Sequence, residues 1–166
     1  MIEPKPSPSA TSAPTQAGPS LLGQTVGHYR ITEKLGAGGM GVVYQALDTK
    51  LERTVALKFL PGNVTISAGD KNNLRREARA ASTLDHPNVG VIHGLEETSD
   101  HHLFIVMQYY EGETLAQRLS RSALPLRETL DLAIQIARGL SAAHAAHIVH
   151  RDIKPSNIIK IGRAHV

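Results

Sequence analysis

The sequence predicts an α+β fold, with a five-stranded antiparallel sheet and one helix followed by a mostly helical part. Two observations carry this prediction. Between residues 29 and 109, alternating or β-branched apolar segments follow one another, separated by glycine clusters and polar turns. Beyond residue 115, apolar residues recur instead at helical spacing, over one short segment and one long one.

The composition is that of an ordinary globular chain. The 166 residues are 41% hydrophobic and contain no cysteine, which excludes disulfides and thiolate chemistry. The net charge is only +3 and aromatic residues make up 4%, so nucleic-acid binding is not expected. No apolar run approaches the ~20 residues that span a bilayer, and no secretory signal is readable. We therefore expect a cytoplasmic protein without a membrane segment in this chain, with a membrane tether in a longer parent as the alternative.

The N-terminal segment differs from the rest of the chain. Residues 1–23 are rich in Pro, Ser, Thr and Ala and hold almost no large apolar side chains. Such a segment cannot bury enough surface to offset the entropy of ordering it. We expect a disordered tail over residues 1–23 and one folded domain over residues 24–159.

Three strands and a helix are expected first. Tyr29–Leu35 alternates like a half-buried strand and ends in a glycine cluster, after which Gly41–Ala46 resumes strand character. A third strand, Thr54–Leu60, ends at a Pro-Gly pair, and the three together form an antiparallel meander. The Ala- and Arg-rich segment Asn72–Leu84 is expected to be a helix that stops before a His-Pro pair.

Two further strands and two helices complete the pattern. Val89–Glu96 and His102–Tyr109 are expected to be strands on either side of a polar turn. Leu115–Leu119 is expected to be a short helix. Leu126–His147 is expected to be a long one, with its apolar residues on one face. A polar loop then leads to a further strand that begins at residues 158–159.

Gly36, Gly38 and Gly41 form a GxGxxG motif between the first two predicted strands. A dinucleotide-binding version needs a helix after the glycines, whereas here a β-branched run follows. A hairpin flap fits better, because glycine has no side chain to keep backbone amides away from phosphate oxygens. An ordinary glycine turn is the alternative.

Lys58 lies at the end of the third predicted strand among apolar residues. A buried, unpaired ammonium is costly, so this side chain must reach solvent or find a partner. Between residues 71 and 84 the only acidic residue is Glu77, on the predicted helix. We expect a Lys58–Glu77 ion pair that holds the ammonium ready for phosphate oxygens, with a solvated surface pair as the alternative.

The segment His150–Asn157, which reads His-Arg-Asp-Ile-Lys-Pro-Ser-Asn, is the strongest signal. Asp152 is placed to orient an attacking hydroxyl and accept its proton. Lys154 is placed to neutralise charge on a transferring phosphoryl group, and Asn157 to bind a metal ion. Positioning and charge stabilisation of this kind are what phosphoryl transfer requires.

With these motifs, the sequence resembles the eukaryotic-type (Hanks-type) serine/threonine protein kinases of bacteria. Within this family, a lysine at the position of Lys154 is typical of the serine/threonine class. The resemblance covers roughly residues 26–159 and rests on five segments: the glycine loop 35–44, Val-Ala-Leu-Lys at 55–58, the run from Arg76-Glu77 to the His-Pro-Asn of 86–88, residues 104–115, and the loop 150–157.

The resemblance implies a protein-kinase-like fold with an ATP cleft between an N-lobe of about residues 24–108 and a partial C-lobe of 109–159. It also implies ATP and Mg²⁺ as cofactors and proteins with Ser or Thr hydroxyls as substrates. The implied nucleotide contacts are Leu35, Val43 and Ala56 around the adenine, Met107 as gatekeeper, the backbones of Gln108 and Tyr110 at the adenine edge, and Glu113 at the ribose. Gln108 replaces the usual glutamate, but its contact is made by the backbone.

After residue 159 the sequence departs from the family pattern. The expected Asp-Phe-Gly, activation segment and Ala-Pro-Glu do not follow, so Mg²⁺ would keep only Asn157. We therefore expect the chain as given to be inactive, and aggregation-prone or only partly folded. Residues 161–166 and a stop are encoded in frame by a common short-read sequencing adapter. We expect 160–166 to be a non-native tail, with a natural frameshift or truncation as the alternative. For function, a non-catalytic ATP-binding pseudokinase or scaffolding module is the alternative.

Overall fold

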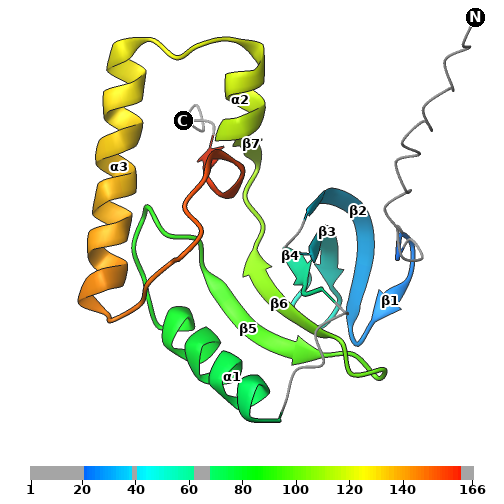
Figure 1. Ribbon diagram of the computed structural model, residues 1–166. Coiled ribbons are helices and arrows are strands. Elements are labelled where there is room, and N and C mark those ends of the chain that lie inside the picture. The colour runs from blue at the N-terminus through cyan, green and yellow to red at the C-terminus, as the bar shows by residue number, and fades with distance from the viewer. Residues whose placement is uncertain (1–20, 39–40, 62–67, 162–166) are drawn as a thin grey trace, which may run out of the picture.

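The computed structural model describes residues 21–38, 41–61 and 68–161. Its elements form two parts (Figure 1): a sheet part, which contains β1–β6 and α1, and a helical part, which contains everything after β6. Nearly all of the predicted tail at residues 1–23 and most of residues 160–166 lie outside the described residues. None of the described helices is long and apolar enough to cross a membrane.

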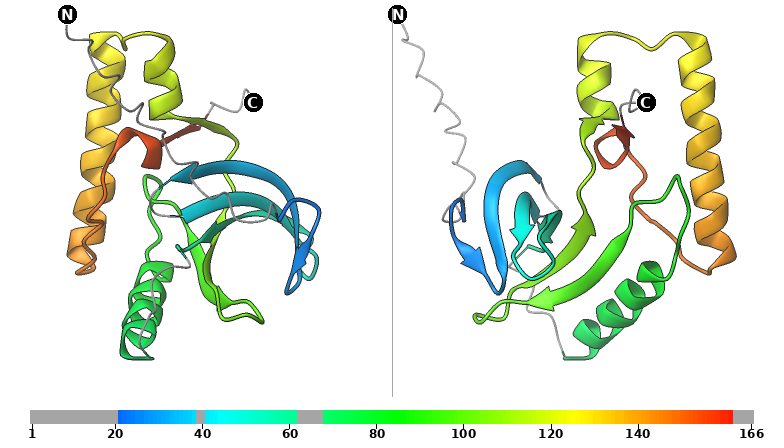
Figure 2. Two further views of the ribbon diagram at one scale, coloured as in Figure 1. Left: turned by 45° about the vertical axis from the view of Figure 1, so that its right-hand side comes forward. Right: turned by 180° about the vertical axis from the view of Figure 1, so that it is seen from behind.

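The sheet part is built on an antiparallel sheet that curls strongly (Figure 2). The five predicted strands are present, and a two-residue strand, β1, is added at one edge by the pairing of Thr25 with Arg30. A strand of two residues is too short to show period-2 alternation, so the sequence does not reveal it. The spatial order is β1-β2-β3-β4-β6-β5. The strands are β1 (Thr25–Val26), β2 (Tyr29–Gly38), β3 (Gly41–Asp48), β4 (Arg53–Phe59), β5 (Ile92–Glu97) and β6 (Leu103–Gln108).

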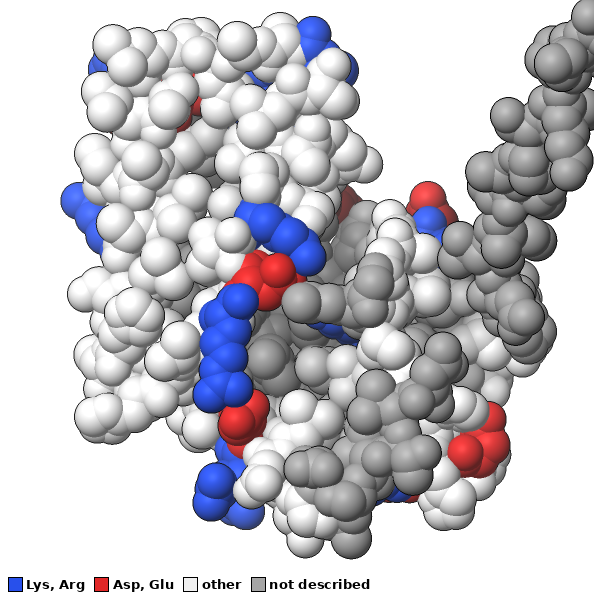
Figure 3. Space-filling model, viewed as in Figure 1, with Lys and Arg blue, Asp and Glu red and all other residues white. Residues whose placement is uncertain are grey.

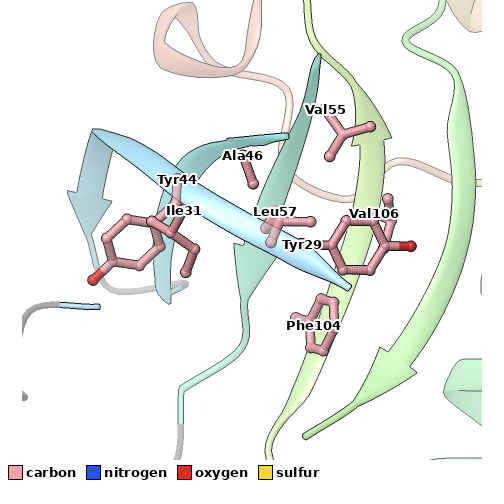
Figure 4. Close-up of a cluster of buried hydrophobic side chains, with 8 residues drawn as sticks. All are labelled: Tyr29, Ile31, Tyr44, Ala46, Val55, Leu57, Phe104 and Val106. Carbon is pink, nitrogen blue, oxygen red and sulfur yellow. The ribbon is translucent and has the colours of Figure 1, made fainter. Parts of the chain in front are cut away.

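The curled sheet closes around its own hydrophobic core (Figure 4). Each of four strands contributes two residues spaced by two, so their side chains share one face of the sheet. All eight side chains are at most 5% exposed. Phe104 packs edge-on against Tyr29 at 6.0 Å and stacks on Phe59 at 5.1 Å. The eight are Tyr29 and Ile31, Tyr44 and Ala46, Val55 and Leu57, and Phe104 and Val106.

Helix α1 (Ala68–Ser82) packs against β5, as both views of Figure 2 show. The helix begins four residues before the predicted start, and Ala78 is its one fully buried side chain among those described. Polar contacts supply the rest of the attachment. Lys71 and Arg75 each lie 2.9 Å from a carboxylate oxygen of Glu97, at the end of β5.

The helical part begins with a short strand and helix. It consists of β7 (Gly112–Thr114), α2 (Leu115–Arg121), α3 (Leu126–Ala145), the 3₁₀ turn η1 (Pro155–Asn157) and β8 (Ile159–Ile161). A capping box starts α2: the Thr114 hydroxyl accepts from the Gln117 amide, and the Gln117 side chain accepts from the Thr114 amide. β7 pairs with β8, so the predicted strand at residues 158–159 is present and runs on to Ile161.

Helix α3 touches the sheet part through a glycine. A Cβ at Gly139 would lie 2.6 Å from the carbonyl oxygen of Asn88, in the loop before β5. Beside it, the Asn88 side chain donates to the Gln135 carboxamide at 3.3 Å. Glycine therefore allows a close approach that no other residue permits without a shift of the backbone.

Candidate functional site

The glycine motif forms a hairpin flap, as predicted, because β3 follows it and pairs with β2. A Cβ at Gly36 or Gly38 would meet no atom within 4 Å, so both backbones border open space. Gly41 differs: its φ is +110°, and a Cβ there would lie 1.8 Å from the Phe59 carbonyl oxygen. The first two glycines leave room for a ligand, whereas the third is required by packing against β4.

Strand register brings several of the predicted adenine contacts together beneath this flap. Ala56 on β4 pairs directly with Met107 on β6, and Val43 on β3 pairs with Lys58 on β4. Leu35 lies in β2 where the register with β3 shifts, and its side chain is partly exposed. The apolar side chains thus come from four adjacent strands of one curled sheet.

The chain after β6 is held by hydrogen bonds to the loop before β5. The Gln108 amide donates to the Val91 carbonyl at 2.9 Å, and the Val91 amide donates to the Tyr110 hydroxyl at 3.1 Å. Glu113, the predicted ribose contact, is ion-paired with Arg121 of α2. A ribose hydroxyl would have to compete with that guanidinium for the carboxylate.

The predicted ion pair between Lys58 and Glu77 is wrong for this structure. Both residues are described, no ion pair joins them, and the Glu77 side chain is exposed. Two features of the packing explain this. Ala78 is the buried side chain of α1, and Glu77 points about 100° of helix rotation away from it. Lys58 lies on β4, which β6 separates from β5.

The loop between α3 and β8 brings the three predicted catalytic residues together. One carboxylate oxygen of Asp152, Oδ2, accepts from Asn157 Nδ2 at 2.7 Å and lies 2.9 Å from Lys154 Nζ. Asn157 Nδ2 also donates to the Asp152 carbonyl, at 2.9 Å. Within the described chain, Oδ1 of Asp152 has no hydrogen-bond partner.

The hydrogen bond from Lys154 holds the pKa of Asp152 below its ordinary value, against the opposing effect of partial desolvation. The hydrogen bond from Asn157 and the positive charges of Lys154 and Lys58 lower this pKa further. Lys58 on β4 is therefore within electrostatic reach of Asp152. At neutral pH Asp152 is ionised, the form that accepts a proton.

The site suits a magnesium ion carried largely by its substrate. Mg²⁺ prefers oxygen ligands and is typically bound by one or two protein groups together with phosphates and water. Because Nδ2 of Asn157 is engaged by Asp152, its amide oxygen is the atom left to bind a cation. Among the residues that the structure describes, no group of three or more His, Cys, Asp or Glu side chains could hold a metal alone.

Sequence reasoning missed the ion pairs that tie this region together. Lys160 of β8 pairs with Glu128 at the start of α3, and Arg118 of α2 lies 3.8 Å from the same carboxylate. These pairs join residues up to 32 positions apart, and no local pattern marks them. Only the capping box of α2 left a readable signature, the Thr-x-x-Gln at residues 114–117.

Comparison with known proteins identifies the family. The protein kinase domain model matches residues 29–165, and the chain therefore belongs to the protein kinase family. The fold agrees: the kinase domain of PknI from Mycobacterium tuberculosis matches with a TM-score of 0.74 and 28% identity, over 82% of this chain and 55% of that one.

The similar curated proteins are bacterial serine/threonine kinases, which confirms the predicted resemblance. Serine/threonine-protein kinase PrkC of Bacillus subtilis is 42% identical over 141 residues, or 84% of this chain and 22% of PrkC. PknA of M. tuberculosis is 38% identical over 138 residues, or 80% of this chain and 32% of PknA. The chain thus spans about a fifth to a third of the length of these relatives.

Proposed function

We propose that this chain carries the nucleotide site and catalytic loop of a serine/threonine protein kinase. The reaction is transfer of the γ-phosphate of Mg²⁺-ATP to Ser or Thr hydroxyls of proteins in the cytoplasm, where ATP is available. One observation carries the proposal: Lys154 and Asn157 converge on one oxygen of Asp152 and leave its other oxygen open. The sheet part supplies the Lys58 ammonium and the backbone of the glycine flap, which are the groups that would bind the phosphate oxygens.

Each group has a task that its geometry supports. Asp152 Oδ1 accepts the hydrogen bond of the substrate hydroxyl and later its proton. Lys154 and Lys58 offset the negative charge of the phosphoryl group in transit. A bound magnesium ion would supply further neutralisation of the phosphates, with Asn157 as one of its ligands. The backbones of Gly36 and Gly38 border the space where phosphate oxygens would lie.

Adenine binding is assigned to Leu35, Val43, Ala56 and Met107, with the backbones of Gln108 and Tyr110 at its edge.

Two adjustments are needed before the arrangement is complete. Helix α1 must turn so that Glu77 meets Lys58, and Glu113 must leave Arg121 to reach a ribose. We infer that the 166-residue chain binds ATP weakly and does not turn it over.

A non-catalytic, ATP-binding role is the second candidate. The absence of a Lys58–Glu77 pair favours it, because an unanchored lysine positions phosphates poorly. The intact glycine flap, Lys58 and Asp152 favour catalysis instead, since no inert residue replaces any of them.

The decisive experiment removes the Asp152 carboxylate in a complete domain. Residues 21–159, continued through a full C-lobe, are assayed for phosphate transfer from labelled ATP to a protein substrate. Asp152→Asn should lower kcat by about 10²–10⁴-fold, the range for loss of a general base, with ATP affinity nearly unchanged. Asp131→Asn makes the same change on the exposed surface of α3 and should leave the rate unaltered. An Asp152→Asn enzyme of full rate would refute the proposal.

A further inference from the structure

Residues 122–125 join α2 to α3 at the end of the helical part farthest from the sheet part (Figure 1). None of the residues assigned above to ATP, magnesium or catalysis lies in this segment. Its first residue, Ser122, is exposed and ends α2 in an extended conformation, with φ −167° and ψ 157°. An exposed, extended segment is accessible to another enzyme without the unfolding of a helix.

The Ser122 hydroxyl already has a cationic partner. Arg118, one turn earlier in α2, donates from Nη1 to the Ser122 hydroxyl oxygen at 2.7 Å and to its carbonyl oxygen at 3.4 Å. The other end of this guanidinium is only loosely engaged, since Nη2 lies 3.8 Å from a carboxylate oxygen of Glu128. Ser120 gives the contrast: it is also exposed, but its hydroxyl donates to the Gln117 carbonyl within the helix at 2.8 Å.

A second arginine on the same face of α2 is bound to a different residue. Arg121 follows Arg118 by three residues, a spacing that puts Cβ atoms about 5–6 Å apart. Its guanidinium is ion-paired with Glu113, the predicted ribose contact. Both partners of this pair are partly exposed, and exposed ion pairs contribute little to stability. A stronger anion beside the two arginines would therefore compete with Glu113 for Arg121.

We propose that Ser122 is a phosphorylation site, whose phosphate is held by Arg118 and Arg121 and thereby releases Glu113. A phosphoserine carries about −1.5 to −2 charges at neutral pH and has three acceptor oxygens, so it binds two guanidinium groups at once. The dipole of α2 opposes a negative charge at this end. However, the end of a helix carries only about half an elementary charge, which two full positive charges outweigh.

The transfer follows the chemistry proposed above and is carried out by a second molecule of the complete kinase. Ser122 Oγ forms a bond to the γ-phosphorus of ATP, the bond from this phosphorus to its bridging oxygen breaks, and ADP leaves. The hydroxyl proton passes to the catalytic carboxylate of the second molecule. ATP is the only co-reactant, and the phosphate remains on Ser122.

Phosphorylation of Ser122 would also act on the nucleotide site. With Arg121 bound to the phosphate, the Glu113 carboxylate no longer has to leave an ion pair before it reaches a ribose hydroxyl. The affinity for ATP should rise about two- to fivefold, which corresponds to the loss of one exposed ion pair. This coupling rests on the proposed function, whereas the attachment of the phosphate to the two arginines does not.

Labelling tests whether Ser122 accepts a phosphate. The complete domain is incubated with Mg²⁺-ATP and with its own Asp152→Asn variant as the substrate, and the phosphorylated positions of the variant are mapped by mass spectrometry. Ser122 should be labelled at least about tenfold faster than Ser120, which can enter an active site only after α2 opens. Equal labelling of the two serines, or no label on Ser122, overturns the proposal.

The hold of the arginines on the phosphate is tested on the 166-residue chain with phosphoserine incorporated at position 122. The control chain carries phosphoserine at position 120. The phosphate at position 122 should bind its second proton about tenfold more weakly than the control, because two nearby positive charges favour the dianion. The ³¹P chemical shift as a function of pH measures this affinity, and equal values at the two positions contradict the proposal.

Paired variants of the chain phosphorylated at Ser122 separate a specific contact from general attraction. Arg118→Gln should tighten proton binding about threefold, since one of the two neighbouring charges is lost. Arg127→Gln removes the same charge from an exposed residue that makes no hydrogen bond to Ser122 within the described chain, and should change proton binding less than about 1.5-fold. Equal effects of the two variants would refute the assigned contact.

The release of Glu113 has its own readout, the ATP affinity of the complete domain with and without phosphoserine at position 122. Arg121→Gln should give the same gain in affinity without a phosphate, and the phosphate should then add nothing further. An affinity that does not respond to the phosphate would overturn the release of Glu113. A domain that phosphorylates an added protein but never Ser122 refutes this site alone. A phosphate held by the arginines in a domain that never binds ATP refutes the kinase assignment alone.

Discussion

The sheet part and the helical part of this chain bury their apolar residues to very different extents. Eight core residues of the sheet are at most 5% exposed and contact one another across four strands. In α3, by contrast, the only fully buried residues are Gly139 and Ala143. The apolar side chains of its N-terminal half, Leu126, Leu130 and Ile134, are 75%, 54% and 49% exposed.

This difference indicates that the sheet part contributes most of the stability of the chain. The sheet curls onto itself and encloses its own core. Helix α3 has an amphipathic sequence, but the described chain provides little for its apolar face to pack against. The surface over α2 and α3 in Figure 3 is accordingly poor in charge. The loop that holds Asp152, Lys154 and Asn157, the predicted catalytic residues, comes directly after this weakly supported helix.

Truncating one apolar side chain in each part should give the largest difference between the two parts. Phe104→Ala removes a ring in contact with Tyr29 and Phe59, and should lower the free energy of unfolding by about 3–5 kcal/mol. Ile134→Ala in α3 should change it by no more than about 0.5 kcal/mol, because the side chain is half exposed. Urea denaturation followed by circular dichroism measures both, and similar losses would refute the contrast.

The joint between the parts should be the next most sensitive position. Gly139→Ala forces a Cβ against the Asn88 carbonyl and should cost about 1–3 kcal/mol as the backbone shifts. Ala142→Gly, one turn along the same helix, should cost only the ~1 kcal/mol of helix propensity. The measurement is the unfolding free energy of the two variants. A Gly139→Ala chain as stable as the parent would mean that α3 is not in contact with the sheet part.

Alkaline pH should weaken the sheet part through one hydroxyl. Tyr29 is buried and donates to Glu96 at 2.5 Å; burial, then the Glu96 hydrogen bond, raises its pKa well above 10. A group whose pKa is raised on folding stabilises the protein below its unfolded pKa and loses that contribution as pH rises. Stability should therefore fall above about pH 10, by at most about 1.4 kcal/mol per pH unit. Tyr29→Phe should remove that extra slope, and an unchanged slope would contradict the assignment.

The smallest effect on stability should come from the exposed face of α3. Leu130→Lys and Ile134→Lys remove apolar surface that the described chain leaves in water, and each should alter unfolding by less than about 0.5 kcal/mol. Solubility should rise, because the apolar face no longer drives self-association. Sedimentation as a function of concentration measures this. Variants that unfold would show that the face is packed in solution.

Much of this arrangement could be predicted from sequence, and the failures have physical reasons. The long strands, the helix at Leu126 and the Asp152 loop follow from local patterns, in which residues a few positions apart determine the outcome. The Lys58–Glu77 pair was predicted wrongly because no local pattern determines how α1 rotates on β5. In the structure, Lys71 and Arg75 of α1 instead bind the Glu97 carboxylate, which lies 26 and 22 residues away in the sequence. The roles of the nucleotide residues stay predictions.

Native-state hydrogen exchange of the 166-residue chain tests the central claim most directly. Amides of β3, β4 and β6 should exchange only through global unfolding, because their strands enclose the core. Amides in the first turns of α3 and in the Asp152 loop should exchange through much smaller, local openings. Equal protection of α3 and β4 in a monomeric chain would contradict the account, since it would show that the helical part is as well supported as the sheet.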